Sequence, residues 1–499
     1  MAKIVKTPGI YIEEKNAFPG SVVEVATAIP AFIGYTEKAD RKGKSLVNIP
    51  TKITSFTEYT ELFGRAFVPK FQLNPKATDP NKSDQHLITI NGEEKALSYN
   101  DDHELYLFRS IQLFFANGGG PCYMVSVGTY EGKPNGIAIR KEALLGGLDT
   151  LLKEQEPTIV VVPDAVKLTS DDCYAVYAQV LAHCAKMQSR VAIFDIHSGS
   201  GERMQPQGDV IGIFREQIGS EFLDYGAAYY PWLNTTIVGK QETTFQNLAD
   251  SVKLKDILKE EEAQTIIREY GDPKGKTGQE ISNFHRGLVA SSATYVRLLD
   301  AIRKIMNLLP PSGALAGLYT TVDNDRGVWK APANIPINRV INPSLHITHE
   351  QQESLNVDEK SGKSINAIRT FPGIGTLVWG GRTLDGNSPD WQYINVRRTL
   401  IMLEQSIKLA LRAYVFEPND ATTWSTVKSM IVNFLTDQWK QGALTGTSPE
   451  DAFDVQIGLG TTMTSLDILE GSMLVSVKLA VVKPAEFIVV TFEQQMQKP

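Results

Sequence analysis

The chain has 499 residues, of which 42% are hydrophobic and 21% are charged, a balance typical of a globular protein with a hydrophobic core. This length is too great for one ordinary domain and predicts roughly two to four. The net charge is −7 and no basic stripe with interleaved aromatic residues is present, which argues against nucleic acid as a partner.

The N-terminal stretch MAKIVKTPGIYIEE lacks the apolar core of a secretory signal peptide. No run approaches the roughly 20 apolar residues that cross a bilayer, so no membrane partner is predicted. Cys122, Cys173 and Cys184 lack C-x-x-C spacing, which suits reduced thiols in a reducing compartment. We therefore expect the protein to be assembled in the cytoplasm and, if released, to leave by a route other than general secretion.

The first 25 residues are predicted to form an extended arm. In TPGIYIEE the side chains of Ile10 and Ile12 alternate with Tyr11, as in a short strand. The Pro19-Gly20 pair ends this stretch. The sequence offers no nearby partner for the strand, so its backbone groups must pair elsewhere.

Residues 26–335 are predicted to form a large α/β domain. Between Glu104 and Trp232, amphipathic helical patterns alternate with apolar runs such as PTIVVVPDA and RVAIFDIH. This alternation favours a largely parallel sheet flanked by helices on both faces. A polar stretch near 68–103 and a charged stretch near 240–278 interrupt the pattern and are interpreted as surface insertions.

The segment NGGGPCYMVSVG, which starts at Asn117, has the glycine content of a phosphate-binding loop but the wrong order of elements. A phosphate loop runs from a strand through the glycines to a helix N-terminus. Here a helical pattern comes first, Gly118 occupies a C-cap position, and Pro121 precedes an apolar strand. The segment therefore predicts a helix–turn–strand connection without a nucleotide.

Two groups of histidines and cysteines were considered as metal ligands. His346, His349 and Glu350 read H-x-x-H-E in a strand-and-loop context, rather than the helical H-E-x-x-H of zinc proteases. The second group is Cys173, His183, Cys184 and His197. Its first three members fall in one helix, where the two cysteines have a spacing compatible with core packing. No metal site and no cofactor are predicted.

An enzymatic function stays open as the alternative. Asp164, Asp195 and His197 lie at the ends of predicted strands, where α/β sheets bind ligands. The G-x-S-x-G frame of α/β hydrolases is absent, and aspartates at strand ends also serve as turn or N-cap residues. No catalytic residue is therefore assigned, and the alternative is a hydrolase-like α/β enzyme with an unrecognised active site.

The C-terminal third reads as a smaller α+β region that contains a helical hairpin. Apolar residues at three- and four-residue spacing predict helices at Arg397–Phe416 and Thr422–Leu444. Their exposed positions carry Glu404, Lys408, Arg412, Lys428, Asp437 and Lys440. MLVSVKLAV alternates like a strand, and after Pro484 the stretch from Phe487 to Phe492 predicts one more.

Several of these stretches together resemble the tail sheath proteins of contractile phages and contractile injection systems. RGVWKAPAN, which begins at Arg326, and WQYINVRR, which begins at Trp391, carry the resemblance most specifically. TPGIYIEE, IPAFIGYTE and FFANGGGPCYMVSVG extend it over nearly the whole chain. The two insertions match nothing in that family and are interpreted as surface decoration.

The resemblance implies a different position in the assembly for each part of the chain. It places residues 26–335 on the outside and a C-terminal domain of residues 336–482 innermost, facing a tube. It makes residues 1–25 and 483–499 terminal arms that add strands to the sheets of neighbouring subunits. Whether the particle is a phage tail or a cell-assembled injection system stays open.

The same resemblance implies a mechanical function: a subunit that polymerises helically around an inner tube and contracts to drive the tube through a target envelope. The implied partners are further copies of the chain, the tube protein, and baseplate and terminal cap proteins, without nucleic acid or membrane. The residues assigned on this basis are the arm strands Ile10, Tyr11, Ile12, Phe487, Ile488, Val489 and Val490, the hinges Pro19, Gly20 and Pro484, and the candidate tube-facing cations Lys408, Arg412, Lys428 and Lys440.

Overall fold

The computed structural model describes residues 21–76, 86–100, 104–205, 208–271 and 276–487. The chain forms two compact units. The sheet unit comprises Ala26–Ile401 together with the chain from Lys483, and the C-terminal unit comprises Met402–Val482 together with the chain up to Val25. Each unit is described here by itself.

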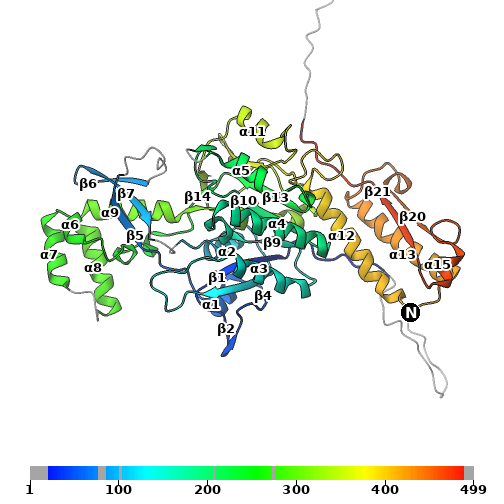
Figure 1. Cartoon of the computed structure of the whole chain (residues 1–499), viewed down its shortest axis with the longest axis horizontal. Coiled ribbons are helices and arrows are strands. Elements are labelled where there is room, and N and C mark those ends of the chain that lie inside the picture. Colours follow the sequence, from blue (N-terminus) through cyan, green and yellow to red (C-terminus); the bar gives the residue numbers. More distant parts are fainter. Residues whose placement is uncertain (1–20, 77–85, 101–103, 206–207, 272–275, 488–499) are drawn as a thin grey trace, which may run out of the picture. The chain divides into compact units, whose positions relative to one another are not determined.

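A nine-stranded sheet forms the centre of the sheet unit (Figure 1). In spatial order its strands are β16 (Ile335–Pro336), β19 (Gly375–Val378), β18 (Asn366–Phe371), β13 (Gly226–Tyr230), β10 (Val191–Asp195), β9 (Ile159–Val161), β1 (Pro30–Thr36), β8 (Cys122–Thr129) and β4 (Thr51–Ile53). The strands from β18 to β8 pair in parallel, and antiparallel pairing adds β19 and β16 at one edge and β4 at the other. The predicted mixed α/β fold is therefore confirmed.

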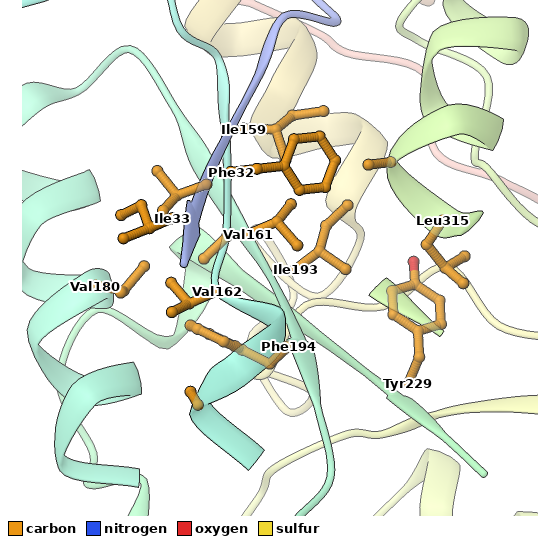
Figure 2. Packing of buried hydrophobic residues seen from close by; sticks show 14 of the residues in the cluster. Phe32, Ile33, Ile159, Val161, Val162, Val180, Ile193, Phe194, Tyr229 and Leu315 are labelled. Carbon is orange, nitrogen blue, oxygen red and sulfur yellow. The ribbon is translucent and has the colours of Figure 1, made fainter. Parts of the chain in front are cut away.

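Helices cover both faces of this sheet. They are α1 (Phe56–Phe63), α2 (Leu107–Ala116), α3 (Lys141–Thr150), α4 (Ser170–Met187), α5 (Val210–Gln217), α10 (Ser312–Arg326) and α11 (His349–Asn356). Neighbouring residues of a strand point to opposite faces, so Phe32 packs edge-on against Phe114 of α2, with ring centroids 5.3 Å apart, while Ile33 faces α3. Figure 2 shows Val180 of α4 and Leu315 of α10 on opposite sides of the strands.

The two stretches interpreted as separate insertions share one hydrophobic core. A three-stranded sheet, β5 (Phe71–Pro75), β7 (Glu93–Tyr99) and β6 (His86–Ile90), contributes Phe71, Ile90 and Leu97 to it. The second stretch and the residues that follow contribute the helices α6 (Leu254–Ile257), α7 (Glu261–Tyr270), α8 (Gly278–Ser291) and α9 (Ala293–Met306). We call this body the accessory core; sequence analysis did not predict that its two parts meet.

The glycine segment has the predicted helix–turn–strand geometry. Helix α2 ends at Ala116, Gly118 adopts a positive φ of 86°, and β8 begins at Cys122. The amide of Gly119 donates to the carbonyl of Phe114 at 2.9 Å, which closes the end of the helix. This prediction is confirmed, and the glycines face the carbonyl end of a helix.

Short paired strands complete the sheet unit. They form the sheets β15 (Leu308–Leu309), β14 (Leu233–Thr235) and β17 (Val340–Pro343); β2 (Asp40–Arg41) and β3 (Lys44–Ser45); and β11 (Met204–Gln205) and β12 (Gly208–Asp209). Strands β18 and β19, which belong to the large sheet, come from within the range 336–482 that sequence analysis assigned to an inner domain. The domain boundaries as such stay a prediction.

The C-terminal unit combines helices with one small sheet. Its elements are the end of α12 (Ile394–Leu411), α13 (Ala421–Lys440), α14 (Pro449–Ala452), β20 (Phe453–Ile457), α15 (Ser465–Leu469) and β21 (Val475–Leu479). Both predicted helices are present but stop earlier than predicted. After α13, Gly442 takes a positive φ of 90° that a continued helix cannot contain. Within the described part of the chain, no helix is long and apolar enough to cross a membrane.

Candidate assembly surfaces

The C-terminal unit is built on one apolar stripe of α13. Val427, Ile431, Phe434 and Leu435 recur at three- and four-residue spacing and are buried. The helix packs against β20, as Figure 1 shows. Asp420 begins α13 as an N-cap whose carboxylate accepts the amide of Thr423 at 2.9 Å. The helix therefore provides the platform on which the small sheet lies.

That sheet consists of β20 and β21 alone. The strands pair antiparallel from Phe453 opposite Leu479 to Ile457 opposite Val475. Within the described residues neither strand pairs with a third strand, apart from a single bridge between Leu444 and Val481. Helix α13 supports one face of this sheet, but a free strand edge presents unpaired N–H and C=O groups to other chains. The β20–β21 sheet is thus a candidate acceptor for added strands.

Side-chain burial in β21 supports this interpretation. Val475, Val477 and Leu479 should define the buried face of an alternating strand, yet each is only half-buried. Across the sheet, Phe453 and Val455 of β20 are buried. The β21 face is therefore incompletely covered within a single chain, as expected if a neighbouring subunit completes it.

Large apolar side chains are also exposed in the loops and on the helices α12 and α15 of the C-terminal unit. Phe416 is fully exposed and takes a positive φ of 74°, which is unusual for an aromatic residue. The amide side chain of Asn419 donates to the carbonyl of Ser472 at 3.0 Å and joins two of these loops. The other exposed apolar residues are Leu409, Val415, Leu459, Leu466, Leu469 and Leu474. Exposed apolar surface of this extent is typical of contact with other proteins.

The four candidate tube-facing cations are all exposed. Lys408 lies near the end of α12, Arg412 just beyond it, and Lys428 and Lys440 lie on α13. Lys440 lies 3.8 Å from Asp437, and in the described part of the chain the other three form no ion pair. Their charges are therefore available to a partner; the contact with a tube stays a prediction.

Most of the predicted arm residues lie outside the described residues. These are Ile10, Tyr11, Ile12, Ile488, Val489 and Val490, together with the hinge residues Pro19 and Gly20. Phe487 and Pro484 are described. Phe487 is 71% exposed and belongs to no strand, so the arm strand predicted to begin there is untested.

Asp164, considered for the enzymatic alternative, forms hydrogen bonds with backbone amides. Asp164 is fully buried just after β9. Its carboxylate accepts hydrogen bonds from the backbone amides of Tyr35, Tyr106 and Leu107 at 2.7–3.0 Å. Two of these amides lie at the N-terminus of α2, where N–H groups lack partners within the helix. Burial raises the pKa of Asp164, and the three amides oppose this rise. The residue caps a helix from a distant strand.

Asp195 has the same function for α10. The amide and hydroxyl of Ser312, the first residue of that helix, donate to its two carboxylate oxygens at 2.8 and 2.5 Å. Burial raises the pKa of Asp195 to about 7, against the effect of these two hydrogen bonds. Neither oxygen is directed at a solvent-filled site, because the side chain is 1% exposed.

His197 lacks the third member of a catalytic triad. Its Nδ1 lies 3.2 Å from the hydroxyl of Ser198, but its Nε2 lies 3.0 Å from the carbonyl of Leu168. A triad needs an acid in the position of that carbonyl. In the described part of the chain neither Asp164 nor Asp195 is hydrogen-bonded to His197. The strand-end residues therefore do not assemble into acyl-transfer machinery.

The considered metal ligands are also explained by packing. Cys122, Cys173 and Cys184 are buried free thiols, and burial raises the pKa of Cys184 to about 12. The predicted strand-and-loop context of H-x-x-H-E holds for His346, in the loop after β17, but is wrong for His349 and Glu350, because Thr348 caps α11, which begins at His349. Across residues 21–487, where described, no group of three or more His, Cys, Asp or Glu side chains could hold a metal ion.

Comparison with known proteins identifies the kind of assembly that these surfaces fit. Residues 387–495 match the family model described as phage tail sheath C-terminal domain. Among curated proteins, the tail sheath protein of Salmonella phage ViI is 24% identical over 180 residues, which are 34% of this chain and 28% of that protein. The tail sheath protein of Enterobacteria phage T4 is 26% identical over 137 residues, 27% of this chain and 20% of that protein. The chain thus aligns with less than a third of the length of either relative.

Solved structures match almost the whole chain. The sheath complex of the extracellular contractile injection system PVC, in its contracted state, is 27% identical with a TM-score of 0.60 and covers 99% of both chains. The contracted helical sheath of the anti-feeding prophage is 28% identical with a TM-score of 0.60 and covers 99% of this chain and all of that one. A subunit in the baseplate structure of that prophage is 28% identical with a TM-score of 0.59.

Proposed function

We infer that this chain is a tail sheath protein of the contractile phage tails and phage-tail-like injection systems, as its sequence resemblance predicted and as these matches confirm. We propose that it polymerises helically around an inner tube and contracts to drive that tube through a target envelope. The observation that carries this proposal is the match to contracted sheath subunits over 99% of the chain.

Polymerisation is proposed to occur by strand exchange. The arms at residues 1–25 and 483–499 would add strands to the open edges of the β20–β21 sheet of neighbouring subunits. About four new backbone hydrogen bonds contribute roughly 2–6 kcal/mol, and ordering a free arm costs a comparable few kcal/mol. Each link is therefore weak alone, and a helical array gains stability by repeating it. A heterologous contact that does not close into a ring produces such a filament.

Contraction is proposed to use the arms as tethers while the subunit bodies rotate and slide. Pro19, Gly20 and Pro484 are the proposed hinges of this motion. An extended sheath that holds energy loaded during assembly needs no nucleotide, which agrees with the helix–turn–strand geometry of the glycine segment. The subunit would then be a structural component in which Asp164 and Asp195 hold helices rather than a substrate.

Contact with the tube is proposed to involve Lys408, Arg412, Lys428 and Lys440. Exposed cations form contacts that depend on salt and are individually weak, which would allow the tube to slip free when the sheath contracts. The further proposed partners are baseplate and terminal cap proteins. Assembly is proposed to take place in the bacterial cytoplasm, with the subunit ending in a phage tail or a tail-like particle.

A pelleting assay tests the strand-exchange step. The full chain, a chain that ends at Glu486 and a chain that lacks residues 1–20 are centrifuged at equal concentration. We expect only the full chain to sediment as polymer, while the truncated chains keep its melting temperature because neither deletion removes a residue of the two hydrophobic cores in the described part of the chain. Sedimentation of both truncated chains at the level of the full chain would contradict strand exchange.

A further inference from the structure

The predicted strand of the C-terminal arm, from Phe487, follows immediately after a largely buried ionic contact. Glu486 is the residue before Phe487, and its carboxylate receives a bidentate contact from Arg382: Nε lies 3.1 Å from each oxygen and Nη2 lies 2.6 Å from Oε2. The side chain of Asn356 donates to Oε1 at 2.9 Å, and the hydroxyl of Tyr393 donates to Oε2 at 3.0 Å. Arg382 and Glu486 side chains are 6% and 20% exposed.

Arg382 is held in place by groups other than Glu486. Its Nη1 donates to the carbonyls of Gly386 at 3.3 Å and Asn356 at 3.5 Å. Its guanidinium lies 5.8 Å from the ring centroid of Tyr393, and its backbone forms a bridge with the same residue. The cation is therefore positioned by the body of the sheet unit, and the chain end supplies the matching anion.

The N-terminal arm is followed by a second contact of the same kind. The hydroxyl of Thr27 donates to Asp323 at 2.5 Å, and Nη2 of Arg398 donates to the carbonyl of Thr27 at 3.1 Å. Arg398 and Asp323 form a bidentate pair at 2.9 and 2.5 Å, and each side chain is 3% exposed. The guanidinium of Arg398 also lies 4.7 Å from the ring centroid of Tyr319.

The two contacts converge on one short segment of the chain. Tyr393, which binds Glu486, immediately precedes α12, and Arg398 lies within the first turns of that helix. Five residues of helix extend over about 7.5 Å. Thr27 and Glu486, which are far apart in sequence, therefore both contact the segment from Tyr393 to Arg398 at the beginning of α12.

We propose that Arg382 and Arg398 anchor the two terminal arms to the sheet unit, so that force transmitted through the exchanged strands enters the subunit at the beginning of α12. The inference rests on the proposed sheath function for its mechanical part. It also moves the pivot of the C-terminal arm from Pro484 to the residues beyond Glu486. The Glu486 carboxylate holds the chain after Pro484, and Nζ of Lys483, before it, donates to the carbonyl of Pro389 at 2.7 Å.

Hydrogen exchange of the full chain tests the anchors without requiring assembly. Glu486→Gln leaves the buried Arg382 charge without its anion, and Thr27→Val removes one hydroxyl donor. We expect Glu486→Gln to accelerate amide exchange at residues 485–487 at least tenfold and to leave residues 26–29 unchanged, whereas Thr27→Val does the reverse. The control is Glu156→Gln, which breaks the exposed Lys52–Glu156 pair and should alter neither segment. Unchanged exchange at 485–487 in Glu486→Gln would overturn the C-terminal anchor.

Polymer yield tests the mechanical part. We expect Glu486→Gln to keep the wild-type melting temperature within a few degrees but to lower the pelleted fraction several-fold, and Arg382→Gln combined with Glu486→Gln to cause no further loss. A polymer yield equal to that of Glu156→Gln would overturn the force path. Failure of the wild-type chain to pellet under any condition would instead contradict the sheath function, while the exchange result would still decide whether the anchors exist.

Discussion

At the scale of single residues, the polar groups at the strand ends stabilise the fold. Asp164 and Asp195 occupy the positions where α/β sheets bind ligands. From sequence alone, they left an enzymatic function as the alternative. In the structure, each carboxylate accepts hydrogen bonds at the N-terminus of a helix that is distant in sequence. Local pattern cannot reveal this function, because the donors at Tyr106 and Ser312 lie 58 and 117 residues from their acceptors.

Replacement of Asp164 tests this structural function. Asp164→Ala leaves the buried amides of Tyr35, Tyr106 and Leu107 without an acceptor, and we expect the free energy of unfolding to fall by about 2–5 kcal/mol. Denaturant unfolding followed by circular dichroism measures the change. The matched control is Asp149→Ala on the exposed side of α3, which should stay within about 0.5 kcal/mol of the wild type. Equal stabilities of the two variants would refute the capping function.

The anchor at Glu486 should respond to acid. Burial opposes ionisation of this carboxyl, but Arg382 and Asn356 hold its pKa below the ordinary 4.5. A carboxyl whose pKa is lowered by folding stabilises the fold above its unfolded pKa and loses that contribution as the pH falls through the folded value. We therefore expect the difference in melting temperature between the wild type and Glu486→Gln to be constant from pH 7 to about 5 and to shrink below about pH 4. A difference that grows on acidification would contradict this assignment.

At the scale of elements, periodicity predicted what is local. The pattern located the helix–turn–strand at Gly118, the strand β21 and the helices α12 and α13, although both helices end earlier than predicted, because each depends on spacing within a few residues. The accessory core could not be predicted in this way. Its strands at 71–99 and helices at 254–306 are separated in sequence by four strands of the large sheet, and their polar composition concealed the buried residues that they share.

A cavity in the accessory core tests whether its two parts form one body. Leu97 of β7 is 1% exposed, and Leu97→Ala should lower stability by about 2–5 kcal/mol. We expect hydrogen exchange to accelerate both in residues 86–99 and in residues 284–306, while the strands of the large sheet stay protected. Leu87→Ala on β6, where the side chain is 43% exposed, is the control. Acceleration confined to residues 86–99 would show two independent insertions.

At the scale of the whole molecule, specific stretches were more informative than composition. RGVWKAPAN and WQYINVRR led to the sheath family, and solved sheath structures match 99% of the chain. Sequence could not show that β20 and β21 form a sheet of only two strands with incompletely covered side chains, because pairing between strands is a tertiary property. The arms that would complete this sheet are proposed to come from neighbouring chains.

Electron microscopy of the purified chain, alone and with a candidate tube protein, tests the central claim most directly. The sheath function predicts long, hollow, regular helical polymers whose inner diameter accommodates the tube. It also predicts that charge reversal at Lys408 and Arg412 lowers the fraction of tubes that are covered, whereas Lys133→Glu, on an exposed loop of the sheet unit, does not. A chain that stays monomeric at high concentration, both alone and beside the tube, would contradict the account.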